Sequence, residues 1–257
     1  MNRITDYKKL SIDIVEWLAN YATNNNIKAF VVGVSGGIDS SVSSTLAAST
    51  GLPVYALGMP IRQKEEQETL SDSHLEWLQL NFSNVIIHKF DLTKTFDTFH
   101  FTMGEFGSNQ LALANSRSRL RMVTLYQIAA SVGGIVVGTG NKVEDYGVGF
   151  YTKYGDGGVD IAPIADLYKT EVWELGKLLG IDQRIIEAKP TDGLWDDGRT
   201  DEDQIGTSYE MLEWVMERGI NEDPMFLSEE QINAIQIYKK FNNQNKHKMI
   251  SIPTFKL

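Results

Sequence analysis

The chain has 257 residues, of which 42% are hydrophobic and 23% are charged, and it contains no cysteine. These proportions are ordinary for a globular protein, and the lack of cysteine excludes disulfides, a thiolate nucleophile and a Cys-ligated zinc site. The net charge of −10 argues against a general nucleic-acid binder, because phosphate contacts need clustered Lys and Arg, but it leaves a nucleotide substrate open.

No apolar run reaches the roughly 18 residues that a membrane span needs. Residues 1–17 alternate charged and apolar residues, unlike the unbroken apolar core of a signal peptide. We therefore expect no membrane segment and a cytoplasmic location. The length and the absence of repeats or low-complexity linkers predict one domain over residues 1–257.

Apolar runs alternate with helical patterns in the first half of the chain. An amphipathic helix is predicted over 7–22, and the apolar run 28–34 suits a buried parallel strand. The remaining strands are predicted at 52–58, 84–88 and 134–138, and the remaining helices at 39–49, 65–80 and 109–131. This order predicts an α/β fold, a doubly wound parallel sheet with helices on both faces.

The order changes after residue 140. Residues 140–162 are rich in Gly and Tyr and are predicted to form a functional loop. A helical C-terminal part is predicted, with helices at 168–179, 182–188, 203–218 and 228–241. Between them, residues 189–202 are predicted to be mobile, and 189–207 are a candidate lid over the substrate.

The strongest local signal is Ser35-Gly-Gly-Ile-Asp-Ser-Ser41, which stands between a predicted strand and a predicted helix. Two glycines let the backbone approach an anion, and the helix N-terminus adds about half a positive charge. Ser35, Ser40 and Ser41 would donate hydrogen bonds to phosphate. Asp39 would repel a bare phosphate, so its presence implies a bridging cation, most simply Mg²⁺. The alternative is an ordinary strand–turn–helix in which Asp39 caps the helix.

This loop lacks the lysine of a Walker A loop and does not match G-x-G-x-x-G. It resembles the SGGxDS motif of the PP-loop ATP pyrophosphatases, which bind the pyrophosphate of ATP and cleave at the α-phosphate. The resemblance implies a Rossmann-like fold of the adenine nucleotide alpha hydrolase type. It also implies that the loop holds the phosphates of ATP through Gly33, Val34, Ser35, Gly36, Gly37, Ile38, Asp39 and Ser40.

A second site is indicated where the fourth predicted strand ends, because ligands of open α/β sheets bind at the carboxyl edge. Thr139 would contact the adenylate there, and Glu144 would be a second carboxylate for the metal. Residues 149–160 then combine aromatic residues, a lysine, glycines and two aspartates. Such a mixture suits stacking, phosphate pairing and close backbone approach.

The segment from Gly149 to Asp160 resembles the GxTKYGDGGxD signature of NAD synthetases. Further segments match that family in the same order: 165–169, 189–192, 200–209 and the pair 247–248. The similarity covers the chain from about residue 5 to its end. Two departures, Ile38 for the more usual Gln and Gly140-Asn-Lys for Asp-His, leave every assigned ligand in place. The chain is identified as a member of the ammonia-dependent NAD synthetases, ligases that amidate deamido-NAD.

The resemblance assigns roles residue by residue. It implies that Asp39 and Glu144 ligate Mg²⁺, and that Thr139, Lys169 and Thr191 contact ATP. The residues that it implies for deamido-NAD are Arg119, Lys153, Asp160, His247 and Lys248. Arg119 is chosen by its spacing before Thr139, and Arg121 is its near competitor. Asp39 and Lys169 would act in catalysis, and Asp156 is a candidate for holding ammonium and accepting its proton.

Each of these residues also has a simpler interpretation. Lys153 and His247 alone read as surface residues, and Lys169 as the start of a helix. Arg119 has partners for a structural ion pair on its own helix. Asp156 and Asp160 precede or end Gly-rich turns, where Asp is common for its local hydrogen bonds.

The reaction implied by the family forms an acyl-adenylate from ATP and deamido-NAD, releases pyrophosphate, and lets ammonia displace AMP. Because the chain has no cysteine, we expect no fused glutaminase and therefore free ammonia as the nitrogen source. The family also implies a homodimer, to which the apolar helix 109–131 would contribute unless it packs in the core.

Three alternatives remain at this point. A GMP-synthetase-like domain or a tRNA-modifying ligase would use the same loop, although the net charge of −10 disfavours the tRNA enzyme. A nucleotide-binding regulator without catalysis is the third, and the set of Asp39, Glu144 and Lys169 argues against it.

Overall fold

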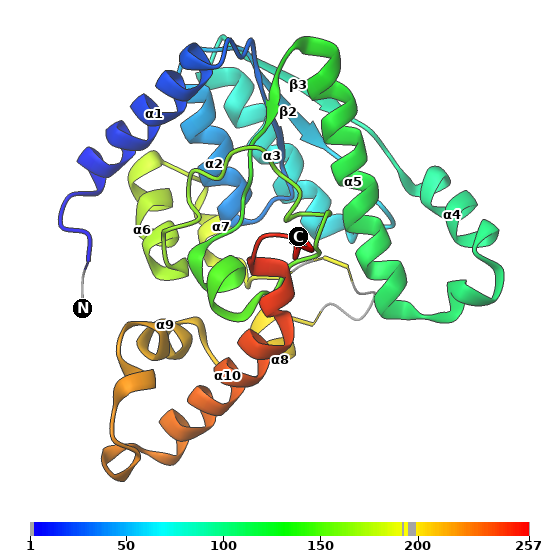
Figure 1. The fold of residues 1–257 in the computed structure, drawn as a ribbon. Helices are drawn as coiled ribbons and strands as arrows, with labels where there is room; N and C mark the ends of the chain where they lie inside the picture. Colours follow the sequence, from blue (N-terminus) through cyan, green and yellow to red (C-terminus); the bar gives the residue numbers. More distant parts are fainter. Residues whose placement is uncertain (1–2, 192, 195–198, 257) are drawn as a thin grey trace.

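The computed structural model describes residues 3–191, 193–194 and 199–256. A parallel sheet runs through this part of the chain, with the strand order β3-β2-β1-β4 (Figure 1). Its strands are β1 (Phe30–Gly33), β2 (Val54–Gly58), β3 (Val85–Lys89) and β4 (Ile135–Val136). The predicted parallel α/β sheet is therefore confirmed.

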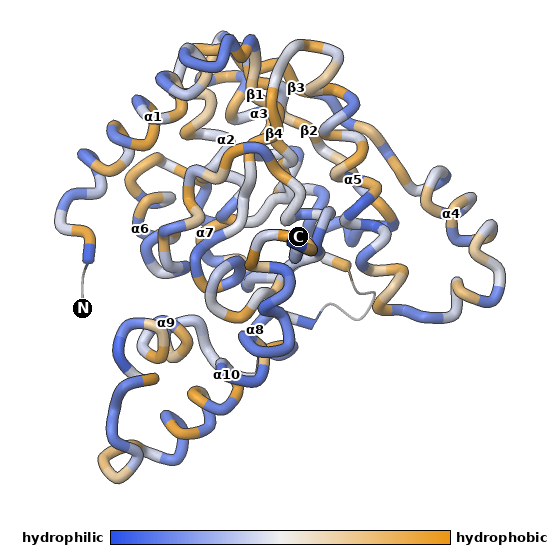
Figure 2. Tube along the Cα trace, viewed as in Figure 1, coloured by the Kyte–Doolittle hydropathy of each residue, from blue (hydrophilic) through white to orange (hydrophobic). Residues whose placement is uncertain are grey.

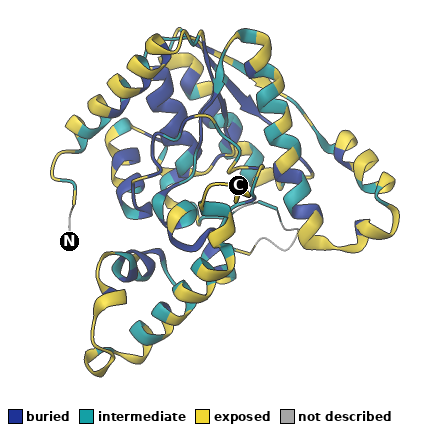
Figure 3. Cartoon of the chain, viewed as in Figure 1, coloured by how far each residue is buried: buried dark blue, intermediate teal, exposed yellow. Residues whose placement is uncertain are grey.

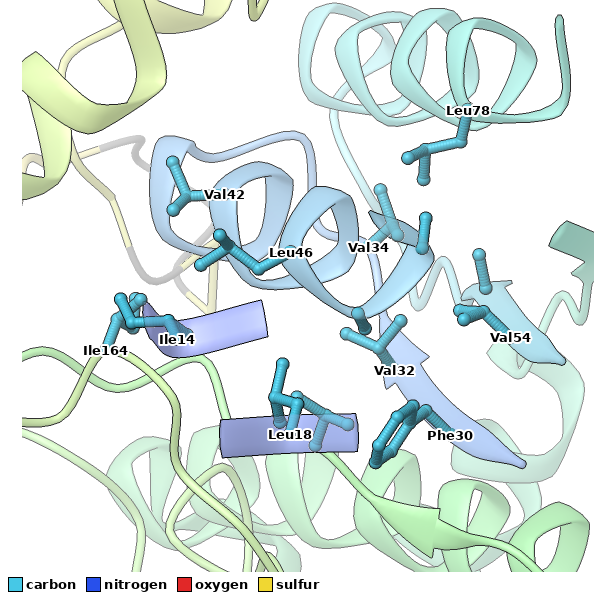
Figure 4. Close-up of a cluster of buried hydrophobic side chains, with 14 of the residues drawn as sticks. Ile14, Leu18, Phe30, Val32, Val34, Val42, Leu46, Val54, Leu78 and Ile164 are labelled. Atoms are coloured by element: carbon cyan, nitrogen blue, oxygen red, sulfur yellow. The ribbon is translucent and has the colours of Figure 1, made fainter. Parts of the chain in front are cut away.

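Helices cover both faces of the sheet, as the doubly wound prediction requires. The helices on one face are α1 (Tyr7–Asn24), α2 (Ile38–Ser49), α3 (Glu65–Asn81) and α6 (Lys169–Leu179), and α5 (Gln110–Val132) lies on the other. Residues of β1 alternate between the two: Phe30 and Val32 share a core with α1 and α2, and Val31 packs toward α5. Figure 4 shows Leu18 of α1 and Leu46 of α2 beside Phe30 and Val32.

Burial of apolar side chains between β1 and the helices α1 and α2 stabilises these layers. Phe30, Val32, Leu18 and Leu46 are all fully buried, and each such side chain contributes about 1.5–3 kcal/mol by leaving water. The centre of the sheet is correspondingly apolar in Figure 2 and buried in Figure 3.

The C-terminal part is helical, as predicted. Its helices are α7 (Gln183–Glu187), α8 (Asp201–Ile205), α9 (Tyr209–Glu217) and α10 (Glu229–Met249), with short turns η3 (Gly219–Asn221) and η4 (Pro224–Phe226). The single helix predicted over 203–218 is wrong, because Gly206 adopts a φ of 94° and ends α8 before α9 begins. Also, α10 extends beyond the predicted residue 241, which places His247 and Lys248 on its last turn.

Three other differences from the sequence prediction follow. Helix α4 (Thr93–Thr102), followed by the turn η1 (Gly104–Ser108), was not predicted, because its Thr and Phe residues favour strands; burial of Phe96 against Ile61 and Leu113 stabilises the helix. The loop predicted over 140–162 contains a π-helix, η2 (Val143–Val148). The strand predicted at 134–138 is shorter, with Val137 forming an isolated bridge to Ile161.

In the described residues, no helix combines the length and apolar character that crossing a membrane demands. The mobility predicted for 189–202 and the lid over 189–207 fall partly on residues 192 and 195–198, which lie outside the described residues.

Candidate active site

The two predicted sites meet at one edge of the sheet. β1 and β4 are parallel neighbours, with Phe30 paired to Ile135. The chain runs from β1 outward to β2 and β3 on one side and then returns to β4 on the other. The strand order therefore reverses between β1 and β4, which is where open α/β sheets bind ligands beyond the carboxyl ends of their strands.

The loop after β1 is shaped by Gly36. Its φ of 87° suits glycine, and a Cβ atom there would lie 2.7 Å from the backbone nitrogen of Ser71 in α3. Gly37 is the N-cap of α2 and brings no side-chain cap. The amides of the first turn of α2 have no acceptor within the helix, so the loop offers donors to an anion.

The serines of the loop bond to the turn itself. Ser40 Oγ accepts from the amide of Ser35 at 3.1 Å and donates to the carbonyl of Gly37 at 3.0 Å, which braces the turn. Ser41, also expected to donate to phosphate, is fully buried, and its hydroxyl donates to Gly37 O at 3.0 Å, so in this structure it points to the turn as Ser40 does. Ile38 points into the core, as expected, with its Cδ1 against Gly176.

Three charged side chains from different elements converge beside this loop. The ammonium of Lys169, at the start of α6, lies 2.5 Å from Asp39 Oδ2 and 3.0 Å from Glu144 Oε1. Lys169 is 2% exposed, and the two carboxylates are mostly buried. Asp39 and Glu144, which the sequence assigned to the metal, thus form one cluster with Lys169, which it assigned to ATP.

This cluster is electrostatically coupled. Burial alone would lower the pKa of Lys169, but Asp39 and Glu144 outweigh it and raise that pKa, so the lysine stays charged. Burial raises the pKa of Asp39. Burial also opposes ionisation of Glu144, yet Lys169 and the hydroxyl of Tyr209 together lower its pKa.

Two residues in the cluster received no role from the sequence. Asn141 is fully buried; its amide nitrogen donates to Asp39 Oδ1 at 3.3 Å, and its oxygen accepts from the amides of Val143 and Glu144. Tyr209 is fully buried and donates to Glu144 Oε1 at 2.7 Å. In the sequence, Asn141 was noted only as a departure from the family pattern and Tyr209 only as part of a motif. Both positions were therefore visible, but nothing local indicated that they bond to Asp39 and Glu144.

Most of the residues assigned to deamido-NAD also come together. Arg119 Nε donates to the carbonyl of Lys153 at 3.2 Å, and Lys153 Nζ donates to the carbonyl of His247 at 2.9 Å. Lys248 Nζ donates to the carbonyls of Gly149 and Tyr151. The end of α10 is therefore held against the segment 149–153, and this segment in turn contacts α5 through Arg119.

The near competitor of Arg119 faces elsewhere. Arg121 Nε donates to the carbonyl of Met59 at 3.0 Å, and its Nη2 donates to Gln63 Oε1 at 3.0 Å. Arg121 therefore ties α5 to the segment after β2, whereas Arg119 lies beside the signature segment. This geometry favours Arg119 as the substrate residue.

The two aspartates of the signature segment bind the fold itself. Asp156 Oδ1 accepts from the hydroxyl of Ser118 at 2.6 Å and from the amide of Thr152 at 3.0 Å. Asp160 accepts from the amide of Val136 at 2.8 Å and from the hydroxyl of Tyr126 at 3.0 Å. Asp156 thus braces its own turn, and Asp160 ties the segment to β4 and α5.

The two threonines assigned to ATP differ in their surroundings. Thr139 is half-buried directly after β4, next to the carboxylate cluster in sequence. Thr191 Oγ1 donates to the carbonyl of Arg199 at 3.1 Å and accepts from the amide of Gly193 at 3.2 Å. Thr191 is thus engaged within its own segment and not with Asp39 or Glu144. Asp192, which follows it in the family motif, lies outside the described residues.

In the described part of the chain, no three His, Asp or Glu residues form a group able to hold a metal ion. Asp39 and Glu144 are a pair of oxygen donors, so a cation at this point would need further ligands from phosphate or water.

A family model described as NAD synthase matches residues 10–256. The chain belongs to the NAD synthase family. It is 35% identical to the NH(3)-dependent NAD(+) synthetase of Finegoldia magna over 92% of this chain and 95% of that protein. It is 38% identical to the enzyme of the same name from Thermococcus kodakarensis, over 84% and 82% of the two chains.

Solved structures agree with this assignment. The fold is similar to that of NMN synthetase from Francisella tularensis, with a TM-score of 0.87, 32% identity, and coverage of 99% of this chain and 100% of that one. An NH3-dependent NAD synthetase from Campylobacter jejuni has the same fold, with a TM-score of 0.78 and 24% identity over 98% and 100% of the two chains.

Membership confirms the resemblance read from the motifs. The NAD synthase family consists of ATP-using ligases, and the α/β fold expected from its signature is the fold observed. The alternatives of a GMP-synthetase-like domain, a tRNA-modifying ligase and a regulator without catalysis fit neither the family match nor the curated relatives.

Proposed function

We propose that this chain amidates deamido-NAD to NAD with free ammonia and ATP. The observation that carries the proposal is the ammonium of Lys169 held between Asp39 and Glu144 at the mouth of an anion-binding loop. This arrangement supports chemistry at the phosphoanhydride of ATP, because it places fixed charge beside the loop amides. The family supplies the substrates.

The nicotinate carboxylate of deamido-NAD is a poor electrophile, so it must first be activated. It attacks the α-phosphorus of ATP, the bond to the bridging oxygen breaks, and pyrophosphate leaves with the electron pair. The loop amides and Lys169 stabilise the charge on pyrophosphate. Ammonia then attacks the acyl carbon, loses a proton, and AMP leaves to give NAD.

The pair Asp39 and Glu144 fits Mg²⁺, because both are ionisable oxygen donors beside the phosphate loop and already bind a cationic group, Lys169. These two residues would hold the ion, which would neutralise phosphate charge when bound. The remaining assigned ATP contacts are Gly33, Val34, Ser35, Gly36, Gly37, Ile38, Ser40, Thr139 and Thr191; Ile38 and Thr191 contribute through their backbones, because their side chains are engaged elsewhere.

Deamido-NAD is proposed to bind beside the signature segment. Arg119, Lys153, His247 and Lys248 meet there, and three of them carry positive side chains suited to the substrate's phosphates. Asp160 supports the site by tying this segment to β4.

Asp156 is proposed to hold ammonium and accept its proton. Asp156 is an exposed residue, Ser118 and Thr152 fix the orientation of its carboxylate, and burial of the carboxyl group raises its pKa. Asp156→Asn keeps the shape and removes the charge. We expect it to lower the ammonia-dependent rate and alter its pH profile; an unchanged rate and profile would reject the role.

A second substrate is favoured by one observation. The likeness to NMN synthetase has the TM-score of 0.87 and covers essentially all of both chains. The corresponding acid, nicotinate mononucleotide, carries the same nicotinate carboxylate without the adenylate half. The same chemistry would therefore convert it, and the two acids must be compared directly.

A homodimer is proposed from the uncovered part of the sheet. Parallel sheets are usually covered on both faces, yet Ile86 of β3 is 39% exposed and His88 is exposed beside Tyr55, with which its ring stacks. The neighbouring arm of α4 and η1 exposes Phe101 and Phe106. Most of this arm is exposed in Figure 3. A second copy would cover these apolar surfaces.

We also propose a cytoplasmic location and a single domain over residues 1–257. The family match over residues 10–256 supports the single domain.

One assay tests the function. Purified protein is mixed with ATP, Mg²⁺ and ammonium chloride, with deamido-NAD or nicotinate mononucleotide in parallel reactions, and AMP, pyrophosphate and the amide product are measured. We expect NAD, AMP and pyrophosphate in equal amounts, and no product when glutamine replaces ammonium. Faster conversion of the mononucleotide would move the assignment to NMN synthesis, and turnover with glutamine alone would overturn the nitrogen source.

A further inference from the structure

Tyr209 lies within the carboxylate cluster, although the sequence assigned it no role. Its hydroxyl lies 2.7 Å from Glu144 Oε1 and 3.3 Å from Asp201 Oδ2. The centroid of its ring is 5.0 Å from Lys169 Nζ, and the ring packs edge-on against Trp173. One side chain thus contacts a carboxylate and the lysine of the proposed catalytic cluster.

The hydroxyl of Tyr209 acts as a donor. An ordinary phenol is protonated at neutral pH and an ionised carboxylate can only accept, so the contact with Glu144 Oε1 is a hydrogen bond donated by Tyr209. A phenol has one proton to donate, and the shorter distance assigns it to Glu144. Lys169 donates to the same oxygen, Oε1, at 3.0 Å. Because Tyr209 and Lys169 both donate to Oε1 of Glu144, the orientation of the carboxylate is fixed, and with it the direction in which Oε2 points.

The backbone of Tyr209 is held by the preceding helix. Glu202 Oε1 of α8 accepts from the amide of Tyr209 at 3.0 Å, and Ser208 caps the start of α9. The amide of Asp201 in turn donates to the carbonyl of Pro190 at 2.9 Å. The position of the Tyr209 hydroxyl therefore depends on how α8 and α9 are seated.

We propose that Tyr209 is a positioning residue that orients the carboxylate of Glu144 to bind a divalent cation held by the phosphates of ATP. Through Tyr209, the orientation of Glu144 also depends on the positions of α8 and α9. This inference rests on the proposed function and deepens it. Partners that orient a metal-binding carboxylate typically affect metal affinity or activity by about 10–100-fold when removed.

The test compares Tyr209→Phe with Tyr238→Phe. Both changes remove a phenolic hydroxyl from the same apolar cluster, but Tyr238 lies on α10, and among the described residues its hydroxyl has only a 3.5 Å contact, with Asn242. Phe at position 209 keeps the ring that packs on Trp173 and faces Lys169. Mn²⁺ binding in the presence of a non-hydrolysable ATP analogue is followed by electron paramagnetic resonance, and kcat and KM for deamido-NAD are measured alongside.

We expect Tyr209→Phe to weaken Mn²⁺ binding by about 10–100-fold and to lower kcat by a similar factor, with KM for deamido-NAD within about twofold. Tyr238→Phe should leave all three unchanged. In a Glu144→Gln background the added effect of Tyr209→Phe should disappear, because the hydroxyl acts through that carboxylate.

Three outcomes decide against the proposal, and a fourth concerns the proposed function alone. Equal Mn²⁺ affinity in the two phenylalanine variants, or a full effect of Tyr209→Phe in the Glu144→Gln background, overturns it. A Tyr209→Phe protein that fails to fold beside a folded Tyr238→Phe protein assigns Tyr209 a structural role instead. Wild-type protein that binds Mn²⁺ with the analogue but makes no NAD rejects the proposed function, while the Mn²⁺ comparison still tests the inference.

Discussion

The ammonium of Lys169 lies 2.5 Å from Oδ2 of Asp39, a residue 130 positions earlier in the chain. The contact joins the first residue of α6 to the first turn of α2. It exists because both helices start at the carboxyl edge of one sheet and pack on the same face.

Replacing Lys169 should affect both stability and activity. In Lys169→Met the carboxylates of Asp39 and Glu144 lose their shared counter-charge, so we expect the free energy of unfolding to fall by about 3–5 kcal/mol. NAD formation should fall below detection. Urea unfolding and the AMP assay measure the two effects. Lys177→Met, on the exposed side of the same helix, is the control and should change stability by less than about 0.5 kcal/mol. Equal effects of the two changes would reject the role of the cluster.

Gly36→Ala should separate backbone strain from collision. Gly36 and Gly51 both have positive φ, 87° and 77°, but only at Gly36 would a Cβ meet another backbone, at 2.7 Å from Ser71 N. We expect Gly51→Ala to cost about 1–2 kcal/mol from strain and leave ATP binding unchanged. Gly36→Ala should cost more and weaken ATP binding at least about tenfold, measured by calorimetry. ATP binding that survives Gly36→Ala would show that the loop does not hold the phosphates.

His74 predicts a specific acid sensitivity. Burial lowers the pKa of His74 to about 4, against about 6.5 when unfolded, and its ring bonds Ser44 at 3.0 Å. The folded protein favours the neutral imidazole of His74. The free energy of unfolding that depends on this is therefore fully present above about pH 6.5 and is lost as the pH falls toward 4. This histidine should account for about 3 kcal/mol of that loss.

The measurement is urea unfolding between pH 7 and 4 for the wild type and two variants. His74→Gln should remove this part of the pH dependence, although it lowers stability at neutral pH. His88→Gln, at an exposed position on β3, should retain it. The prediction fails if His74→Gln and the wild type lose stability in parallel.

Arg119 and Arg121 should give opposite results. Arg119 is exposed and contacts only the carbonyl of Lys153 among the described bonds, so Arg119→Ala should raise KM for deamido-NAD by about 10–100-fold with little loss of stability. Arg121 bonds Met59 and Gln63, so Arg121→Ala should lower stability by about 1–3 kcal/mol. Steady-state kinetics and thermal unfolding of both variants distinguish them. A KM effect confined to Arg121→Ala would reverse the assignment.

The proposed dimer is tested on the exposed edge of the sheet. Ile86→Lys places a charge on the uncovered face of β3, and it should convert a dimer into a monomer in sedimentation velocity at micromolar concentration. Leu80→Lys is the control, since Leu80 is 86% exposed on α3, away from this face. A wild-type monomer at that concentration, or equal effects of both changes, would contradict the dimer.

The sequence alone determined the elements that carry a local signal. The apolar run of β1, the glycines at 36 and 37 and the ordered motifs predicted the parallel sheet, the anion loop and the family, because each depends on residues close together in the chain. It missed α4, whose Phe96 becomes helical only by packing against Ile61 and Leu113.

Tertiary structure decided what distant residues do to one another. Asn141 bridges Asp39 to the segment of Glu144, and Tyr209 donates to Glu144 across 65 positions. No local periodicity in the sequence predicts either contact. Ser40 and Ser41 are adjacent serines in one motif; both are buried and both donate to the carbonyl of Gly37, but only Ser40 also accepts from the amide of Ser35. Such contacts depend on how strands order themselves in the sheet, and a linear pattern does not contain that order.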